Sequence, residues 1–150
     1  MRAETVVLFS IDGMRPDGLQ QAATPTIDRL IATGAATMAA QTVMPSVTLP
    51  CHTSMLRGVP PERHGITDNI WIPMARPVPS VIELIALANR PAAMFYSWEQ
   101  LRDLATPGAL DYTFFLNYYS NSEHDVDGMV AAAAVDYLER KRPAFLFVYL

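Results

Sequence analysis

The sequence predicts an α/β fold with a largely parallel sheet and helices on both faces. Apolar, strand-like runs alternate with segments of helical periodicity, the order expected when crossover helices join parallel strands. The runs at residues 4–11 and 145–150 are almost continuously apolar, as strands covered on both faces are. Composition agrees, because 51% of the residues are hydrophobic and 17% are charged. The strand at 4–11 is expected in the centre of the sheet.

Proline and glycine residues mark where the predicted helices begin and end. Pro25 and Pro50 suit the first turns of two helices, and Gly34 and Gly58 suit their ends. The expected elements, in order, are a strand at 4–11, a turn at 14–18, helices at 19–23, 25–33 and 49–56, a loop at 59–71, a helix at 81–88, a strand at 92–96, a short helix at 97–104, a strand at 111–116, a long helix ending before residue 143 and a strand at 145–150.

Two capping-box patterns precede helices. Ser80 and Glu83 have the required spacing, and Ser120 and Glu123 repeat it before the last helix. The apolar faces expected to be buried are Ile27, Leu30 and Ile31; Val81, Leu84, Ile85 and Ala88; and Val126, Met129, Val130, Ala133, Tyr137 and Leu138.

Asp12 and Thr48 are residue types that suit metal and phosphate chemistry. Asp12 follows the first strand, at the carboxyl end of a parallel sheet, where such sheets bind ligands. Thr48 lies near the start of a helix, so its hydroxyl meets the positive end of the helix dipole, which also favours phosphate. A Thr hydroxyl needs a base or a metal to attack. His52 lies four residues on without an orienting carboxylate, so metal activation with Asp12 is the simpler interpretation. Helix capping is the alternative on spacing alone.

The segments around these residues resemble the alkaline phosphatase superfamily, most closely its nucleotide pyrophosphatase/phosphodiesterase branch, the type I phosphodiesterases. They read VVLFSIDGMRPDGL, then ATPTIDRLIATGA, then MPSVTLPCHTSMLRGVPPERHGITDNIW. The resemblance continues more weakly along nearly the whole chain. It implies that residues 1–150 are the N-terminal part of one alkaline-phosphatase-like catalytic domain, incomplete at its C-terminus.

The resemblance also implies a two-zinc site and a role for each matching residue. Asp12 would bind one Zn²⁺, and Thr48 would be the metal-bound nucleophile that forms a phosphothreonine intermediate. Asn69 would donate to a non-bridging phosphate oxygen, helped by the backbone N–H of Leu49. The implied reaction is hydrolysis of phosphodiester or pyrophosphate bonds in small, nucleotide-type substrates. A phosphomonoesterase or phosphonate hydrolase of the same superfamily is the enzymatic alternative. The second alternative is a non-catalytic binding half-domain, because the remaining metal ligands would lie beyond Leu150.

Four other features have a structural interpretation beside a functional one. Cys51 lacks the C-x-P-x-R pattern of a sulfatase, so we expect it to pack as a small apolar residue. His64 has no second ligand nearby, and we expect it to hold its loop through a backbone hydrogen bond. The apolar segment 71–74 is equally suited to packing and to a wall for a base or an aryl group. His124, with Asp125 and Asp127 beside it, suits the first turn of a helix, where acidic residues are expected, better than a metal site.

Charge and cysteine content exclude several classes of function. The net charge is −4 without a basic run, so binding of nucleic acid through a charged patch is not expected. A single cysteine allows no intrachain disulfide. The sequence has no signal-like segment and no apolar run of membrane-spanning length, so as written the chain is expected to be cytoplasmic. Export of the parent protein is the alternative, because many proteins of the family it resembles are exported. It specifies no oligomeric state.

Overall fold

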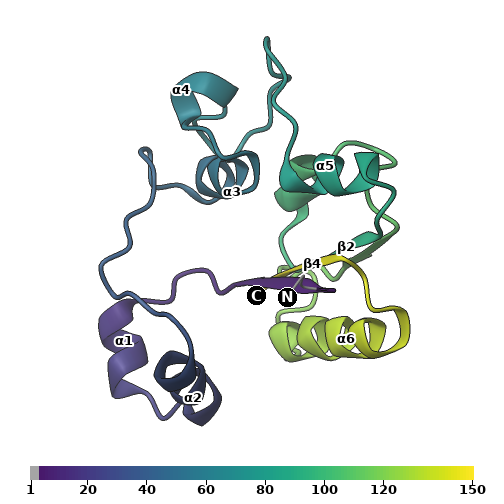
Figure 1. The fold of residues 1–150 in the computed structure, drawn as a ribbon. Coiled ribbons are helices and arrows are strands. Elements are labelled where there is room, and N and C mark those ends of the chain that lie inside the picture. The colour runs from purple at the N-terminus through teal and green to yellow at the C-terminus, as the bar shows by residue number, and fades with distance from the viewer. Residues whose placement is uncertain (1–3) are drawn as a thin grey trace.

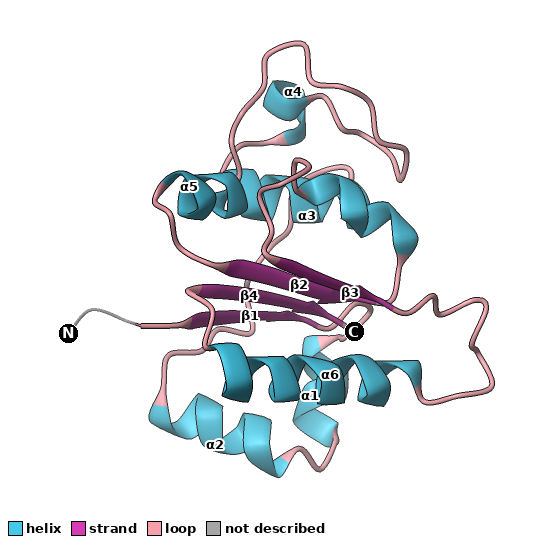
Figure 2. Ribbon diagram, turned by 90° about the vertical axis from the view of Figure 1, so that its right-hand side faces the viewer, coloured by secondary structure: helices cyan, strands magenta, loops and turns pink. Residues whose placement is uncertain are grey.

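The computed structural model describes residues 4–150 and contains a four-stranded sheet in the order β1-β4-β2-β3. Every neighbouring pair of strands is parallel, and helices cover both faces (Figures 1 and 2). The predicted fold class is confirmed. The elements are β1 (Val6–Ser10), α1 (Pro16–Gln21), α2 (Pro25–Thr33), α3 (Thr48–Arg57), α4 (Pro61–His64), α5 (Val81–Leu87), β2 (Ala92–Tyr96), η1 (Glu99–Leu104, a 3₁₀ helix), β3 (Tyr112–Phe115), α6 (Val126–Lys141) and β4 (Phe145–Tyr149).

The two faces of the sheet hold two separate clusters of buried side chains. Met94 and Phe147 lie in the cluster under α3, α5 and η1. Phe95 and Val148, the next residues of the same strands, lie in the cluster against α6. Figure 2 shows α3 and α5 on one side of the sheet and α6 on the other. This alternation follows from the two-residue period of a strand and explains why both central strands are apolar at every position.

The predicted central position of the first strand is wrong for the described residues. β1 lies at the edge of the sheet and pairs only with β4 among residues 4–150. Val6 is 51% exposed and Phe9 is 52% exposed. An apolar run shows that a strand is suited to burial, but it carries no information on strand order. The expected buried face of α2 is also wrong, because Leu30 is 56% exposed and Figure 1 shows α1 and α2 set to one side of the sheet.

The predicted helix starts are partly confirmed. The capping box at Ser80 and Glu83 is present and begins α5. The second one is not, because α6 begins later and its N-cap is Asp125, whose carboxylate accepts a hydrogen bond from the Gly128 N–H at 2.9 Å. Within α5, the buried face centres on Ile82, whereas Leu84, predicted to be buried, is half exposed; Met129 of α6 is half exposed as well.

Two short helices occupy segments for which a turn or a loop was predicted. α1 begins inside the predicted turn at 14–18, and α4 is one turn within the predicted loop at 59–71. Each begins with a proline, whose fixed φ suits the first helical turn. The predicted helix at 49–56 is confirmed as α3. It ends where predicted, because Gly58 adopts a left-handed conformation with φ 67°.

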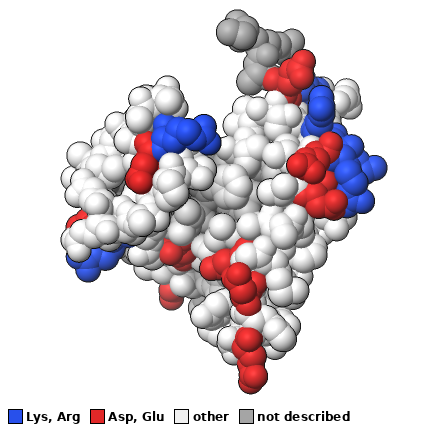
Figure 3. Space-filling model, turned by 90° about the horizontal axis from the view of Figure 1, so that it is seen from below, with Lys and Arg blue, Asp and Glu red and all other residues white. Residues whose placement is uncertain are grey.

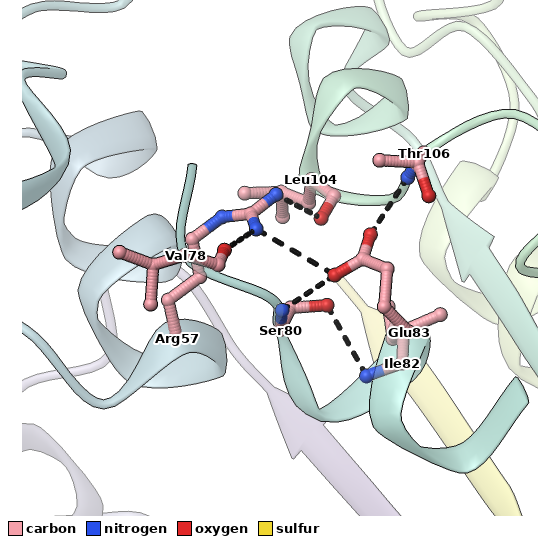
Figure 4. Close-up of polar contacts among 7 residues, drawn as sticks. All are labelled: Arg57, Val78, Ser80, Ile82, Glu83, Leu104 and Thr106. Carbon is pink, nitrogen blue, oxygen red and sulfur yellow. Dashed lines mark hydrogen bonds and ion pairs between the residues drawn. The ribbon is translucent and has the colours of Figure 1, made fainter. Parts of the chain in front are cut away.

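A buried arginine joins the end of α3 to the rest of its layer (Figure 4). The Arg57 side chain is 5% exposed and lies 3.5 Å from the Glu83 carboxylate. Its guanidinium donates to the backbone carbonyl oxygens of Val78 and, at 3.2 Å, Leu104. Glu83 in turn accepts a hydrogen bond from the Thr106 N–H at 2.8 Å. These contacts fix α3, the helix that carries Thr48, against α5 and the end of η1.

The surface of the described residues has no broad basic area on the face shown in Figure 3, where Lys and Arg side chains lie mostly beside Asp or Glu. Exposed ion pairs among the described residues include Arg15–Asp17 and Arg140–Asp136. Over residues 4–150, each helix is too short or too polar to span a lipid bilayer.

Candidate functional site

Asp12 stands directly beyond the carboxyl end of β1, as predicted. Its backbone N–H donates to the Leu150 carbonyl oxygen at 3.0 Å, which extends the pairing of β1 with β4 to this residue. The next residue, Gly13, has a φ of 71°, a left-handed conformation that favours glycine. In this turn the Gly13 N–H donates to Asp12 Oδ1 at 2.9 Å. One oxygen of the carboxylate is therefore held by the backbone.

The other carboxylate oxygen of Asp12 contacts Thr48, the predicted nucleophile. Thr48 is the first residue of α3, and its hydroxyl donates to Asp12 Oδ2 at 3.1 Å. The structure thus brings together two residues that lie 36 positions apart. The phenol of Tyr149, at the end of β4, donates to the same Oδ2 at 2.6 Å.

These contacts change the acidity of the groups involved. Burial alone would raise the pKa of the Asp12 carboxyl, but hydrogen bonds from Tyr149, Thr48 and Gly13 outweigh it and hold the pKa below its usual value. Burial, together with the bond to Asp12, raises the pKa of the Tyr149 phenol. Near neutral pH the site therefore holds an ionised carboxylate and a protonated phenol.

Asn69 lies at the end of the loop that follows α4, next to the start of α3. Its Oδ1 accepts a hydrogen bond from the Leu49 backbone N–H at 2.9 Å. In this structure the Leu49 N–H, which was expected to help bind the phosphate, is therefore occupied by the amide oxygen of Asn69. The same bond orients the Asn69 amide, and it leaves the NH₂ end as the donor of this side chain.

His52 does not contact the Thr48 hydroxyl. Its Nδ1 lies 2.7 Å from the Thr48 carbonyl oxygen, and its Nε2 lies 2.7 Å from the Ser10 hydroxyl. Both ring nitrogens are thus engaged elsewhere, which agrees with the interpretation that His52 is not the base. The side chain instead ties the first turn of α3 to β1.

His64 has the structural role that the sequence predicted. Its Nδ1 accepts a hydrogen bond from the Ile66 N–H at 3.0 Å, and its Nε2 lies 2.9 Å from the Ser54 hydroxyl. The ring is buried, and burial, assisted by the positive charge of Arg57, lowers its pKa. His64 therefore fixes the loop that carries Asn69.

Asp12, Thr48 and Asn69 share one cavity of about 390 Å³. The sequence did not identify the rest of its lining, which is Ser97, Trp98, Tyr118, Tyr119, Asp127, Tyr149 and Leu150. Most of these residues follow the ends of β2, β3 and β4. The carboxyl ends of parallel strands share one edge of a sheet, so a known strand order would have predicted these residues as part of the lining.

The interpretation of segment 71–74 as packing is confirmed for Trp71 and Met74, which lie against the core.

A larger cavity, of about 860 Å³, lies apart from these residues. Thr42, Cys51 and Met55 are among its lining, and Asp12, Thr48 and Asn69 are not. It is therefore separate from the cavity that holds the predicted site residues. Cys51 is half-buried at its wall and accepts a hydrogen bond from the Thr42 hydroxyl at 2.9 Å.

Comparison with known proteins assigns the family. The family model for type I phosphodiesterase / nucleotide pyrophosphatase matches residues 6–84, more than half of the 150-residue chain. The chain belongs to this family. The matched region of this type I phosphodiesterase family member includes Asp12, Thr48 and Asn69.

The curated proteins that this type I phosphodiesterase chain matches are much longer than the chain. Rat ectonucleotide pyrophosphatase/phosphodiesterase family member 3 is 29% identical over 167 residues, which cover 97% of this chain and 18% of the relative. Human family member 1 is 40% identical over 65 residues, which cover 42% of this chain and 7% of the relative. The chain therefore spans less than a fifth of the length of these two proteins.

A solved structure has the same fold. Phosphonoacetate hydrolase from Sinorhizobium meliloti, in complex with phosphonoformate, superposes with a TM-score of 0.74 and 22% sequence identity. The match covers 97% of this chain and 46% of the hydrolase. It confirms the predicted fold class, and this chain spans about half the length of the hydrolase.

Asp12 and Thr48 fit part of a divalent-metal site. Both offer hard oxygen donors, and the two oxygen atoms already face each other. Protein zinc sites use three or four protein ligands, and within residues 4–150 no three His, Cys, Asp or Glu side chains gather into such a group. A complete site therefore needs donors beyond those that these residues bring together.

Proposed function

We propose that this chain supplies the nucleophile side of the active site of a zinc-dependent phosphodiesterase that acts on nucleotide-type substrates. The contact between Thr48 and Asp12, in a cavity shared with Asn69, is the observation that supports it. Membership of the family supports cleavage of phosphoester bonds. Two Zn²⁺ ions are part of this proposal, with Asp12 and Thr48 holding one of them.

In the proposed reaction, the Thr48 oxygen attacks phosphorus in line with the leaving oxygen and forms a phosphothreonine ester, which water then hydrolyses. The hydroxyl proton already points at the ionised Asp12. A bound zinc would supply Lewis acidity that lowers the pKa of this hydroxyl. The Asn69 NH₂ group would stabilise the negative charge that grows on a non-bridging oxygen.

The lining of the cavity supports a nucleotide-type substrate. Trp98, Tyr118 and Tyr119 provide flat apolar surfaces suited to a nucleobase or an aryl group.

Hydrolysis of three substrates by the zinc-loaded, full-length protein that contains these residues tests the proposal. We expect p-nitrophenyl thymidine 5′-phosphate to be cleaved with a higher kcat/KM than p-nitrophenyl phosphate or phosphonoacetate. Thr48→Ala should lower kcat by roughly 10³-fold or more, and Asn69→Ala by about 10²- to 10³-fold. Thr67→Ala is the control, because Thr67 is an exposed threonine in the loop that carries Asn69. Preference for the monoester or for phosphonoacetate would instead support the corresponding alternative.

A further inference from the structure

Tyr149 is placed where it can decide the orientation of Asp12. Its hydroxyl is 2.6 Å from Asp12 Oδ2, a shorter distance than the 3.1 Å from the Thr48 hydroxyl to the same atom. Gly13 holds the opposite oxygen through its backbone N–H. Bonds to both oxygens prevent free rotation of the carboxylate about its last side-chain torsion.

The phenol is also held firmly itself. Tyr149 is 7% exposed, and it pairs with Ser10 across the parallel strands β4 and β1. The His52 ring packs edge-on against it, with ring centroids 5.4 Å apart and an interplanar angle of 71°.

We propose that Tyr149 is a positioning residue: its hydroxyl fixes the Asp12 carboxylate so that Oδ2 faces Thr48. Hydrogen bonds to metal ligands from neighbouring side chains commonly determine both the orientation and the affinity of those ligands. The consequence for metal binding rests on the proposed function. The consequence for the orientation of Asp12 does not, because Gly13, Tyr149 and Thr48 make these contacts without a metal.

Tyr149→Phe in the full-length protein tests this role. It removes the hydroxyl and keeps the ring that packs on His52, so we expect little change in Tm. Zinc affinity, measured by competition with a chromogenic chelator, should fall by about 10- to 100-fold. Tyr96→Phe is the matched control, since Tyr96 is a buried tyrosine at the end of the neighbouring strand β2, in the same core cluster; it should leave zinc affinity unchanged.

The outcomes separate the possible roles of the residue. Unchanged zinc affinity in Tyr149→Phe with a raised KM would overturn the proposal and make Tyr149 a substrate contact. An equal loss of affinity in Tyr96→Phe would also overturn it, because the effect would then come from packing.

Crystal structures of the metal-free proteins give a readout that does not depend on zinc. We expect Asp12 to turn away from Thr48 in Tyr149→Phe and to keep its present orientation in the wild type. An unchanged carboxylate in the variant refutes the proposal. So does a wild-type Tyr149 hydroxyl beyond hydrogen-bond distance of Asp12, a result that does not require the variant to fold. If the wild type binds no zinc, the proposed function fails and these structures alone decide the role of Tyr149.

Discussion

Asp12 joins three segments that are distant in sequence. It receives hydrogen bonds from the backbone of Gly13, from Thr48 at the start of α3 and from Tyr149 at the end of β4. The pairing with Thr48 was predictable, because one motif places a carboxylate after a strand and another places a hydroxyl at a helix start. Tyr149 was not, because its position depends on which strand lies beside β1, and residue patterns do not encode strand order.

His64 should make the free energy of unfolding depend on pH. Its pKa is lowered in the folded state, so the unfolded chain binds a proton at a higher pH than the folded protein does. Stability from this residue is therefore present above the unfolded pKa of about 6.5 and is lost as the pH falls below it. The free energy of unfolding should decline on acidification through this range.

Urea unfolding at several pH values, compared with His64→Gln, isolates this contribution. The variant carries no group that titrates at this position, so its stability should depend less on pH between about 5 and 7. Identical pH dependence in both proteins would mean that the ring is not held in its neutral form.

At the scale of elements, α3 is positioned from both ends. Its first turn is tied to β1 through His52, and its last residue, Arg57, is buried against Glu83. The helix itself was predictable from Pro50 and Gly58. Its anchoring was not, because the partners of Arg57 lie on a loop, on α5 and at the end of η1, and only the fold brings these segments together.

Glu83→Ala tests this anchor. The substitution leaves the Arg57 charge buried without its partner and also removes the capping box of α5. We expect the free energy of unfolding to fall by about 3–5 kcal/mol. Glu62→Ala, in the first turn of α4 and exposed, should change it by less than about 0.5 kcal/mol. A loss of similar size in both variants would show that Arg57 does not depend on Glu83.

At the scale of the molecule, an apolar strand stands at the edge of the described sheet. Strand β1 is exposed there, and the phosphonoacetate hydrolase that has the same fold is about twice as long as this chain. The sequence predicted the layers correctly, because periodicity determines which faces are apolar. It misplaced β1 and the buried face of α2, because burial depends on neighbours that periodicity does not specify.

The 150 residues on their own should show negligible phosphodiesterase turnover. Asp12 and Thr48 provide two donors, whereas zinc sites use three or four protein ligands. Assays of this chain and of a full-length relative, with added zinc and p-nitrophenyl thymidine 5′-phosphate, would compare them directly. Zinc-dependent turnover by the short chain, abolished by Thr48→Ala, would contradict the expectation and mean that another residue or a second copy completes the site.

Trapping the covalent intermediate tests whether Thr48 is the nucleophile. The zinc-loaded, full-length protein would be mixed with a nucleotide diester, quenched rapidly in acid and digested for peptide mass spectrometry. We predict a nucleotidyl ester on Thr48 in the wild-type protein and none at this position in Thr48→Ala. An adduct on a different residue, or undiminished turnover by Thr48→Ala, would show that Thr48 is not the nucleophile.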